Sequence, residues 1–145
     1  MNNVKIYFVI ILLLVHGQLL SANACSCVEW SIKEMFARAQ AVFVGTVVAN
    51  SCEDNNCPEI KSLPTKIVTF KIEKYWKGIK GKEIKISMPA AICCICGTPT
   101  KIGDQLLIYA FGSGDDILES SGCTAYHLKY AQKDLEELGE AKTPK

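Results

Sequence analysis

Two cysteines one residue apart, Cys25 and Cys27, follow a small-x-small triplet that ends at Ala24. Cleavage after Ala24 would make Cys25 the first residue of the mature chain. Its free amine and its own carbonyl oxygen could then close a five-membered chelate ring around a metal ion. Disulfides on both cysteines would hold this terminus still, which lowers the cost of ordering a binding group. Deprotonating an amine whose pKa is about 8 costs only about 1 kcal/mol at neutral pH.

Such a chelate suits a metal ion that keeps an open coordination position. A catalytic zinc ion in a protease has three protein ligands and a replaceable water. Displacing this water would remove the nucleophile that the protease needs. The alternative interpretation is that Cys25 and Cys27 only staple the start of the chain, because disulfides in small secreted domains usually form the scaffold.

Residues 1–24 are predicted to be a secretory signal peptide. They contain Lys5, an apolar run over 6–15 and an Ala22-x-Ala24 cleavage site. The alternatives are an uncleaved anchor and a lipoprotein. Lipidation would use Cys25, but Ala22 stands where a lipoprotein signal usually has leucine. We therefore expect a secreted, extracellular product of residues 25–145.

The charge balance argues against a nucleic-acid partner. The chain has 16 basic and 15 acidic residues, and the leader carries Lys5 but no acidic residue, so the mature chain has no net charge with histidine neutral. Nucleic-acid binding relies on an excess of positive charge. No second apolar run is long enough to span a bilayer, so we expect no membrane contact after cleavage. The length suits one domain, 25–145, and we expect a monomer.

All eight cysteines lie in the predicted mature chain: Cys25, Cys27, Cys52, Cys57, Cys93, Cys94, Cys96 and Cys123. An even number in an exported chain favours disulfides. A structural metal cluster is the weaker alternative, because the mature chain has only His127 as a histidine ligand. Four disulfides would leave no thiol for nucleophilic catalysis. We expect no enzymatic activity and no cofactor of its own.

Hydrophobic spacing predicts a helix at each end of a set of strands. The first helix spans about 31–40, opening with a Ser31-x-x-Glu34 capping box, and the last spans about 126–138, ending at Gly139. Between them we expect five strands, at 41–50, 65–76, 82–88, 105–111 and 117–120. The loops at 51–64 and 89–104 are polar or rich in cysteine, and the tail after Gly139 is expected to fray. This order predicts a mainly β fold: a disulfide-stapled, five-stranded Greek-key barrel of the OB type with flanking helices. A small sandwich is the alternative.

Several short motifs resemble the N-terminal inhibitory domain of the tissue inhibitors of metalloproteinases. They are "CSCVEW" behind the predicted leader, "FVGTV", "YWKG", Cys96-Gly97, and the single Cys123 after a short strand. They occur in the same order as in that family and at comparable spacing. The family's domain has an OB fold and belongs to the netrin-like module group. The resemblance therefore implies a secreted inhibitor of zinc metalloproteinases of the matrix type.

The resemblance also implies roles for cysteines at three places in the chain. It pairs Cys25 with Cys96 and Cys27 with Cys123. It makes Cys25 the residue whose amine and carbonyl chelate the zinc of the partner protease. This zinc belongs to the target and is not a cofactor of the chain.

Residues next to these cysteines would contact the protease. The resemblance implies that the side chain of Ser26 enters the main specificity pocket, and that Cys27 and Val28 continue along the active-site cleft. Cys94 and Ile95 match a second segment that lies beside the first. Together the two segments would form one contact ridge.

The sequence also departs from the family. Serine stands at 26 where threonine is common, the family's third disulfide has no partner here, and its C-terminal domain has no counterpart. Four further cysteines are extra: Cys52, Cys57, Cys93 and Cys94. We expect Cys52 and Cys57 to pair with Cys93 and Cys94, in an order left open, because a Cys93–Cys94 bridge would be strained. A netrin-like extracellular binding module without protease inhibition is the alternative function.

Overall fold

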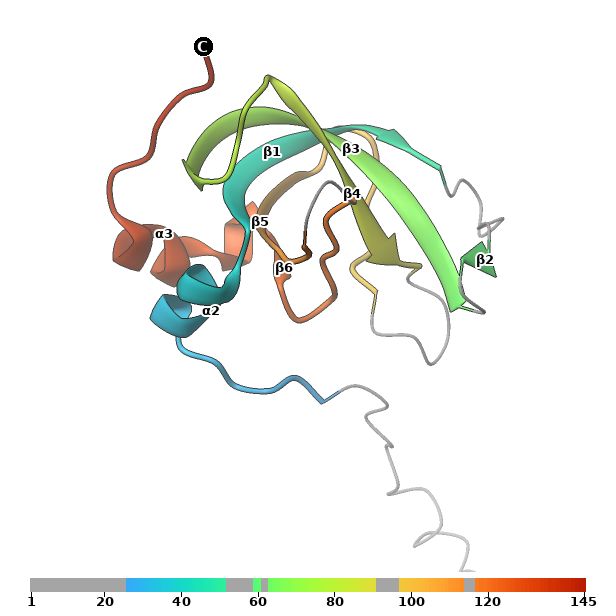
Figure 1. Ribbon diagram of the computed structural model, residues 1–145, viewed down its shortest axis with the longest axis horizontal. Coiled ribbons are helices and arrows are strands. Elements are labelled where there is room, and N and C mark those ends of the chain that lie inside the picture. Colours follow the sequence, from blue (N-terminus) through green and yellow to red (C-terminus); the bar gives the residue numbers. More distant parts are fainter. Residues whose placement is uncertain (1–25, 52–58, 61–62, 91–96, 114–116) are drawn as a thin grey trace, which may run out of the picture.

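The computed structural model describes residues 26–51, 59–60, 63–90, 97–113 and 117–145 of the 145-residue chain. These residues form a mainly β fold, an antiparallel sheet with two α-helices and one 3-10 turn (Figure 1). The strands are β1 (Ala41–Asn50), β2 (Glu59–Ile60), β3 (Leu63–Lys77), β4 (Glu83–Pro89), β5 (Gln105–Ala110) and β6 (Ala125–His127). The helical segments are α2 (Ile32–Arg38), η1 (Leu128–Tyr130) and α3 (Gln132–Leu138).

The long strand β3 organises the sheet. It pairs with β1 along one edge and with β4 along the other, and β1 pairs in turn with β5, which pairs with β6. Among the described residues this gives a five-stranded antiparallel sheet in the order β4-β3-β1-β5-β6, and the two-residue β2 pairs with the start of β3. In Figure 1 the long strands curve strongly, with α2 and α3 together at one side.

A short segment around Glu119 lies between β4 and the end of β5. Its backbone forms a parallel bridge with Ser87 of β4, where the Ser87 N–H donates to the Leu118 carbonyl at 2.9 Å and the Ser87 carbonyl accepts from Ser120 N–H at 3.0 Å. Glu119 and Phe111 also exchange two hydrogen bonds, of 2.7 and 2.8 Å. This segment therefore connects two strands that lie far apart in the order of the sheet.

The sheet is buried on both faces where β1 and β5 run through its centre. One face carries the larger core cluster: Ala41, Phe43, Val47, Val68, Phe70, Ile72, Ile86, Met88, Leu106, Ile108, Ala110 and Ala125. The other face packs under the helices: Ile32, Met35, Ala39, Val42, Val44, Leu107, Tyr109 and Ala131. Burial of both faces explains why β1 reads as a continuous apolar run instead of an alternating one.

Several predicted elements are confirmed. Ser31 and Glu34 form the predicted capping box, in which the backbone N–H of Glu34 donates to Ser31 Oγ and the backbone N–H of Ser31 donates to Glu34 Oε2. The register of β1 against β3 shifts at Gly45, as its place in an apolar strand predicts. Gly139 ends α3 with a φ of 68°. No helix among the described residues is long and apolar enough to cross a membrane.

The "YWKG" motif holds both helices to the sheet. The indole N–H of Trp76 donates to the Gly139 carbonyl at the end of α3, at 3.0 Å. The ammonium of Lys77 donates to the carbonyls of Phe36 and Ala37, both at 3.1 Å, in the last turn of α2. A positive charge at this end also complements the helix dipole.

The other two residues of this motif make backbone contacts. Gly78 has a φ of 72°, and a Cβ there would lie 1.9 Å from the Gln40 carbonyl oxygen, so the turn after β3 requires glycine. Tyr75 exchanges two hydrogen bonds of 2.8 Å with Lys142. The prediction that the tail frays is therefore wrong at Lys142, because these bonds tie the tail to β3.

The predicted C-terminal elements need correction. The segment 117–120, expected to be the fifth strand, makes only isolated bridges at Glu119. The fifth strand of the sheet is instead β6, and the predicted helix over 126–138 divides into β6, η1 and α3. Tyr126 pairs with Leu107 of β5, so backbone pairing prevails over the helical spacing of the apolar side chains. The predicted loop 51–64 is also wrong in part, since β2 and the start of β3 pair there.

Tyr109 gives the fold a testable response to alkaline pH. Its buried hydroxyl donates to Asp134 Oδ2 of α3 at 2.8 Å, and burial together with this hydrogen bond raises the pKa of Tyr109. Above a pH of about 10 the unfolded chain loses this proton while the folded protein keeps it, so the contribution to stability falls as pH rises. We expect Tyr109→Phe to cost about 2 kcal/mol near neutral pH, and this cost to shrink in alkali.

Urea unfolding of both proteins at neutral pH and at a pH of about 10.5 measures this effect. Comparing the two proteins removes the contribution of Lys66, whose pKa is lowered by burial and which acts in the opposite direction. An equal difference in unfolding free energy at both pH values would contradict the prediction.

Candidate functional site

The first described residues form an exposed segment without helix or strand. Residues 26–30 run outward from the cap of α2, and all five are exposed (Figure 1). Val28 is 74% exposed. Cys25, the predicted zinc ligand, lies outside the described residues, so its role stays a prediction. Ser26, Cys27 and Val28 are present as a surface that a partner could contact.

A disulfide between Cys27 and Cys123 ties this segment to the body of the fold. The two Cα atoms are 5.6 Å apart and the residues are 96 positions apart in sequence. These are the two cysteines that the family resemblance pairs. The bond fixes the backbone one residue after Ser26, and two residues after the predicted terminus.

Cys123 itself lies in a tight, hydrogen-bonded turn before β6. The turn is closed by the Thr124 N–H donating to the Ser121 carbonyl at 3.0 Å, and the Cys123 N–H donates to Ser121 Oγ at 3.2 Å. The hydroxyl of Tyr126 donates to the Cys123 carbonyl at 2.6 Å, and burial raises the pKa of Tyr126. The disulfide is therefore attached to an ordered part of the sheet edge.

Trp30 provides a second anchor for the exposed segment. Its ring packs edge-to-face on Phe111 with centroids 6.2 Å apart, and the Arg38 guanidinium lies 4.8 Å from the ring centroid. An aromatic pair and a cation–π contact each contribute about 1 kcal/mol. Val28 thus lies on a short stretch of chain held at both ends. In the sequence, the only signal for this anchor is an aromatic residue just before the helix cap.

The second predicted contact segment is described only at its edges. Cys94 and Ile95 lie outside the described residues. The same is true of Cys52, Cys57, Cys93 and Cys96, so the other predicted disulfides stay predictions. Gly97 is described and packs against the chain at the other end of the segment. A Cβ on Gly97 would lie 2.5 Å from the Pro89 carbonyl oxygen and 2.6 Å from that of Ala90. The two flanks of segment 91–96 are therefore in contact, and the close approach requires glycine.

Residues after Gly97 are held by the same sheet edge that anchors Cys27. The hydroxyl of Thr98 donates to the Ala125 carbonyl at 3.3 Å, and the Nε2 of His127 lies 3.0 Å from the Pro99 carbonyl oxygen. Residues 123–127 therefore hold the first predicted contact segment by a disulfide, and by hydrogen bonds they hold residues 98–99, which follow Gly97. His127 thus links β6 to the residues after Gly97.

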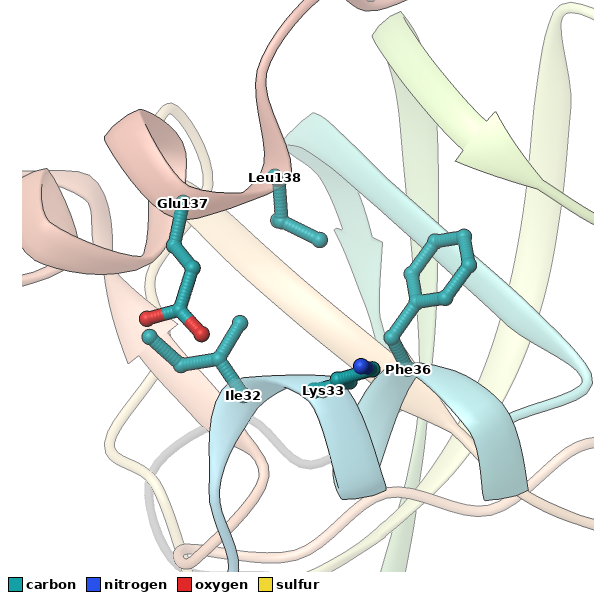
Figure 2. A pocket seen from close by; sticks show the side chains of 5 residues that line it. All are labelled: Ile32, Lys33, Phe36, Glu137 and Leu138. Carbon is teal, nitrogen blue, oxygen red and sulfur yellow. The ribbon is translucent and has the colours of Figure 1, made fainter.

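A separate hollow lies between α2 and α3. It has a volume of about 260 Å³ and is lined by Ile32, Lys33, Phe36, Glu137 and Leu138 (Figure 2). Pockets for small ligands usually have about 300 to 1,000 Å³. Its lining offers one ammonium and one carboxylate on an apolar floor, with no nucleophile. This hollow has no chemistry that would make it an active site.

No group of three His, Cys, Asp or Glu side chains that could hold a metal ion occurs among the described residues. A scan against protein-family models and a search of curated proteins found no match for this chain. The function must therefore be inferred from the residues of the chain and their geometry.

Proposed function

We propose that the mature chain, beginning at Cys25, is a secreted inhibitor of zinc metalloproteinases of the matrix type. The observation that carries this proposal is the Cys27–Cys123 disulfide, which anchors an otherwise exposed segment beside the predicted terminus. A free N-terminus is normally too mobile to act as a good metal ligand. Anchoring it before the partner arrives reduces the entropy that binding must otherwise cost.

In this proposal the amine and carbonyl of Cys25 cap the zinc of the protease. They displace the zinc-bound water, and the protease loses its nucleophile. The amine binds in its neutral form, so inhibition weakens as the pH falls below the amine pKa. The chain contributes no zinc of its own.

The neighbouring residues occupy the cleft on either side of the metal. Ser26 directs its side chain into the specificity pocket, and Cys27 and Val28 follow along the cleft. The 74% exposure of Val28 supports this role, because an apolar side chain held out in water gains free energy when a partner covers it. Cys94 and Ile95 form the second contact segment, and the contacts of residues 123–127 support its position beside the first.

The fold proposed for this domain is a five-stranded Greek-key barrel of the OB type, with the domain spanning 25–145 and residues 1–24 removed as a signal peptide. The segment around Glu119 supports a barrel. Its bridges to Ser87 of β4 and to Phe111 after β5 would join the two sides of the sheet. Closure of this kind leaves few strand edges unpaired.

An inhibition assay on the purified secreted protein tests the function. We expect slow-dissociating inhibition of the catalytic domain of a matrix-type metalloproteinase, and a protein mass that begins at Cys25 with eight hydrogens lost to four disulfides. Substituting Ser26→Gly should raise the inhibition constant by about tenfold, equivalent to about 1.4 kcal/mol, because it empties a pocket but keeps the zinc ligand.

Thr143→Gly, an equivalent change on the exposed C-terminal tail, serves as the control and should leave inhibition unchanged. A secreted protein that inhibits no metalloproteinase in a broad panel would contradict the proposal. That result would favour a netrin-like binding module without inhibitory activity.

A further inference from the structure

A second hollow lies where the turn between β3 and β4 meets the C-terminal tail. It has a volume of about 460 Å³ and is lined by Tyr75, by residues 79–81 of the turn and by residues 142–145 of the tail. All of these residues belong to the described part of the chain. Pockets for small ligands usually have about 300 to 1,000 Å³, so this hollow is large enough to hold one.

Backbone hydrogen bonds hold the two walls of this hollow together. The Tyr75 N–H donates to the Lys142 carbonyl and the Lys142 N–H donates to the Tyr75 carbonyl, both at 2.8 Å. The bond from the indole of Trp76 to Gly139 fixes the chain just before the tail. In Figure 1 the tail leaves α3 on a side of the molecule away from residues 26–30. The hollow is therefore formed without a ligand, which lowers the cost of ordering a binding site.

The lining of the hollow is positively charged. It contains the ammonium groups of Lys80, Lys142 and Lys145 and no side-chain carboxylate. Among the described residues, these three side chains have no partner in a hydrogen bond, an ion pair or a ring contact. Even with the α-carboxylate of Lys145 counted, three positive charges stand against one negative charge. Ammonium groups that face one small volume repel one another, and an anion placed between them would remove this repulsion.

The balanced total charge of the chain hides this local excess. Residues 74–85 contain five lysines and one glutamate, whereas residues 134–140 contain four acidic residues and no basic one. Two of the five lysines are already engaged: Lys74 lies over the ring of Trp76, and Lys77 donates to carbonyls of α2. The other three are exposed. Separation of opposite charges along the surface creates a local field that attracts anions to the turn.

We propose that this hollow binds a sulfate or phosphate group between Lys80, Lys142 and Lys145. A lysine ammonium has three donors on a compact charge, and a tetrahedral oxyanion offers acceptors on every side. Tyr75 and Thr143, which also line the hollow, each carry a hydroxyl that can donate to the same group. The site does not involve the predicted terminus at Cys25, so it goes beyond the proposed function.

The bound group can be a free ion or an ester on a polysaccharide. Both present the same oxyanion to the three lysines. Lys82 and Lys85 follow the turn and are exposed, so the positive charge continues from the hollow onto β4. A chain that carries several esters would contact these lysines as well as the hollow. We therefore expect the ester on a polysaccharide to bind more tightly than the free ion.

Titration calorimetry of the purified mature protein, in the absence of any protease, tests the site. The probes are sodium sulfate, sodium phosphate, a sulfated dextran oligosaccharide and the same oligosaccharide without sulfate. We expect the sulfated oligosaccharide to bind most tightly, the free ions to bind weakly and the unsulfated oligosaccharide not to bind. The affinity for the sulfated probe should fall as salt is added, because binding releases counterions.

Neutralising the three lysines should weaken binding of the sulfated oligosaccharide. The variant Lys80→Gln/Lys142→Gln/Lys145→Gln should raise its dissociation constant by about tenfold or more and reduce the salt dependence. A matched control makes the same change of charge at three exposed lysines outside the hollow: Lys33→Gln/Lys71→Gln/Lys101→Gln. This control should change the dissociation constant by about twofold or less, because distant exposed charges are screened.

Gly81 allows a test that removes no lysine. A Cβ on Gly81 would lie 3.8 Å from the nearest atom, the Glu83 carbonyl oxygen, which is ordinary contact, so a side chain fits there. Gly81→Asp brings a carboxylate to the lining and should weaken binding of the sulfated probe by about tenfold. Gly81→Asn has nearly the same shape without the charge, and it should weaken binding by about twofold or less.

Each outcome either supports the site or overturns it. Equal weakening by the two triple variants would show attraction to total charge and would overturn the hollow as a site, as would equal effects of Gly81→Asp and Gly81→Asn. Binding of no probe, or equal binding of the unsulfated oligosaccharide, would overturn the oxyanion assignment. Free sulfate or phosphate binding as tightly as the oligosaccharide would keep the site but identify the free ion as its ligand.

These measurements are independent of the proposed function. The variant that lacks the three lysines should inhibit a metalloproteinase as well as the unmodified protein does, because it leaves residues 26–30 and the Cys27–Cys123 bond unchanged. A protein that binds the sulfated oligosaccharide but inhibits no protease would contradict the proposed function and leave the oxyanion site standing. A protein that inhibits but binds no anion would do the reverse.

Discussion

Addition of a single alanine before Cys25 is expected to abolish tight inhibition while leaving the thermal midpoint unchanged. The extension converts the chelating amine into a peptide nitrogen, which is a far poorer metal ligand, and it places an extra residue against the floor of the protease cleft. We expect the inhibition constant to rise by about a hundredfold or more, equivalent to roughly 3 kcal/mol. The fold should be unaffected, because the extension leaves the Cys27–Cys123 bond and both core clusters in place.

The matched control adds the same alanine after Lys145, at the other end of the chain. This variant should inhibit like the unmodified protein, since the tail is tied to β3 at Lys142 and ends far from residues 26–30 (Figure 1). Mass spectrometry must first establish that each variant begins at the intended residue. An N-terminally extended protein that inhibits as well as the native one would show that chelation by the amine is not the mechanism.

The strands β1, β3, β4 and β5 could be predicted from the sequence because each carries its own signal. Val68, Phe70 and Ile72 alternate with polar residues, and the resulting strand is β3. The continuous apolar run of β1 was equally clear, because a strand covered on both faces needs no polar side.

The C-terminal region could not be predicted, because two structures compete for the same pattern. Leu128, Ala131, Leu135 and Leu138 have helical spacing, and all four do pack in the cluster under the helices. The strand β6 precedes them because its backbone pairs with β5, and this pairing leaves no trace in the local sequence. Long-range pairing prevailed over local periodicity here.

The candidate site could also be predicted from the sequence only in part. The surface role of Ser26–Val28 and the choice of Cys123 as the partner of Cys27 both came from the family resemblance. Cysteine spacing alone does not determine connectivity. The lysines of the second hollow are visible in the sequence, but nothing in it reveals that Lys80 and Lys142 line the same hollow.

Replacement of Cys27 and Cys123 together by serine should reduce both stability and inhibition. The bond closes a loop spanning 96 positions, and in the chain-entropy model a loop of about 100 residues is worth about 4.7 kcal/mol. That is a large part of the roughly 5 to 15 kcal/mol that stabilises a typical domain, so urea unfolding should show a loss of about 4 to 5 kcal/mol.

The same double variant tests whether the anchor also serves binding. Trp30 should still pack on Phe111 and the predicted Cys25–Cys96 bond would remain, so the chain between these two anchors is loosened, and the sheet should stay folded at low temperature. Under those conditions we expect inhibition to fall by about tenfold or more, because the loosened contact segment must be ordered during binding. Tyr126→Phe is the matched control: it removes the hydrogen bond to the Cys123 carbonyl, costs about 1 kcal/mol and keeps the disulfide. If the folded double variant inhibits as tightly as Tyr126→Phe, the disulfide stabilises the domain without preparing the terminus for zinc. The Cys27–Cys123 bond would then no longer support the proposed function.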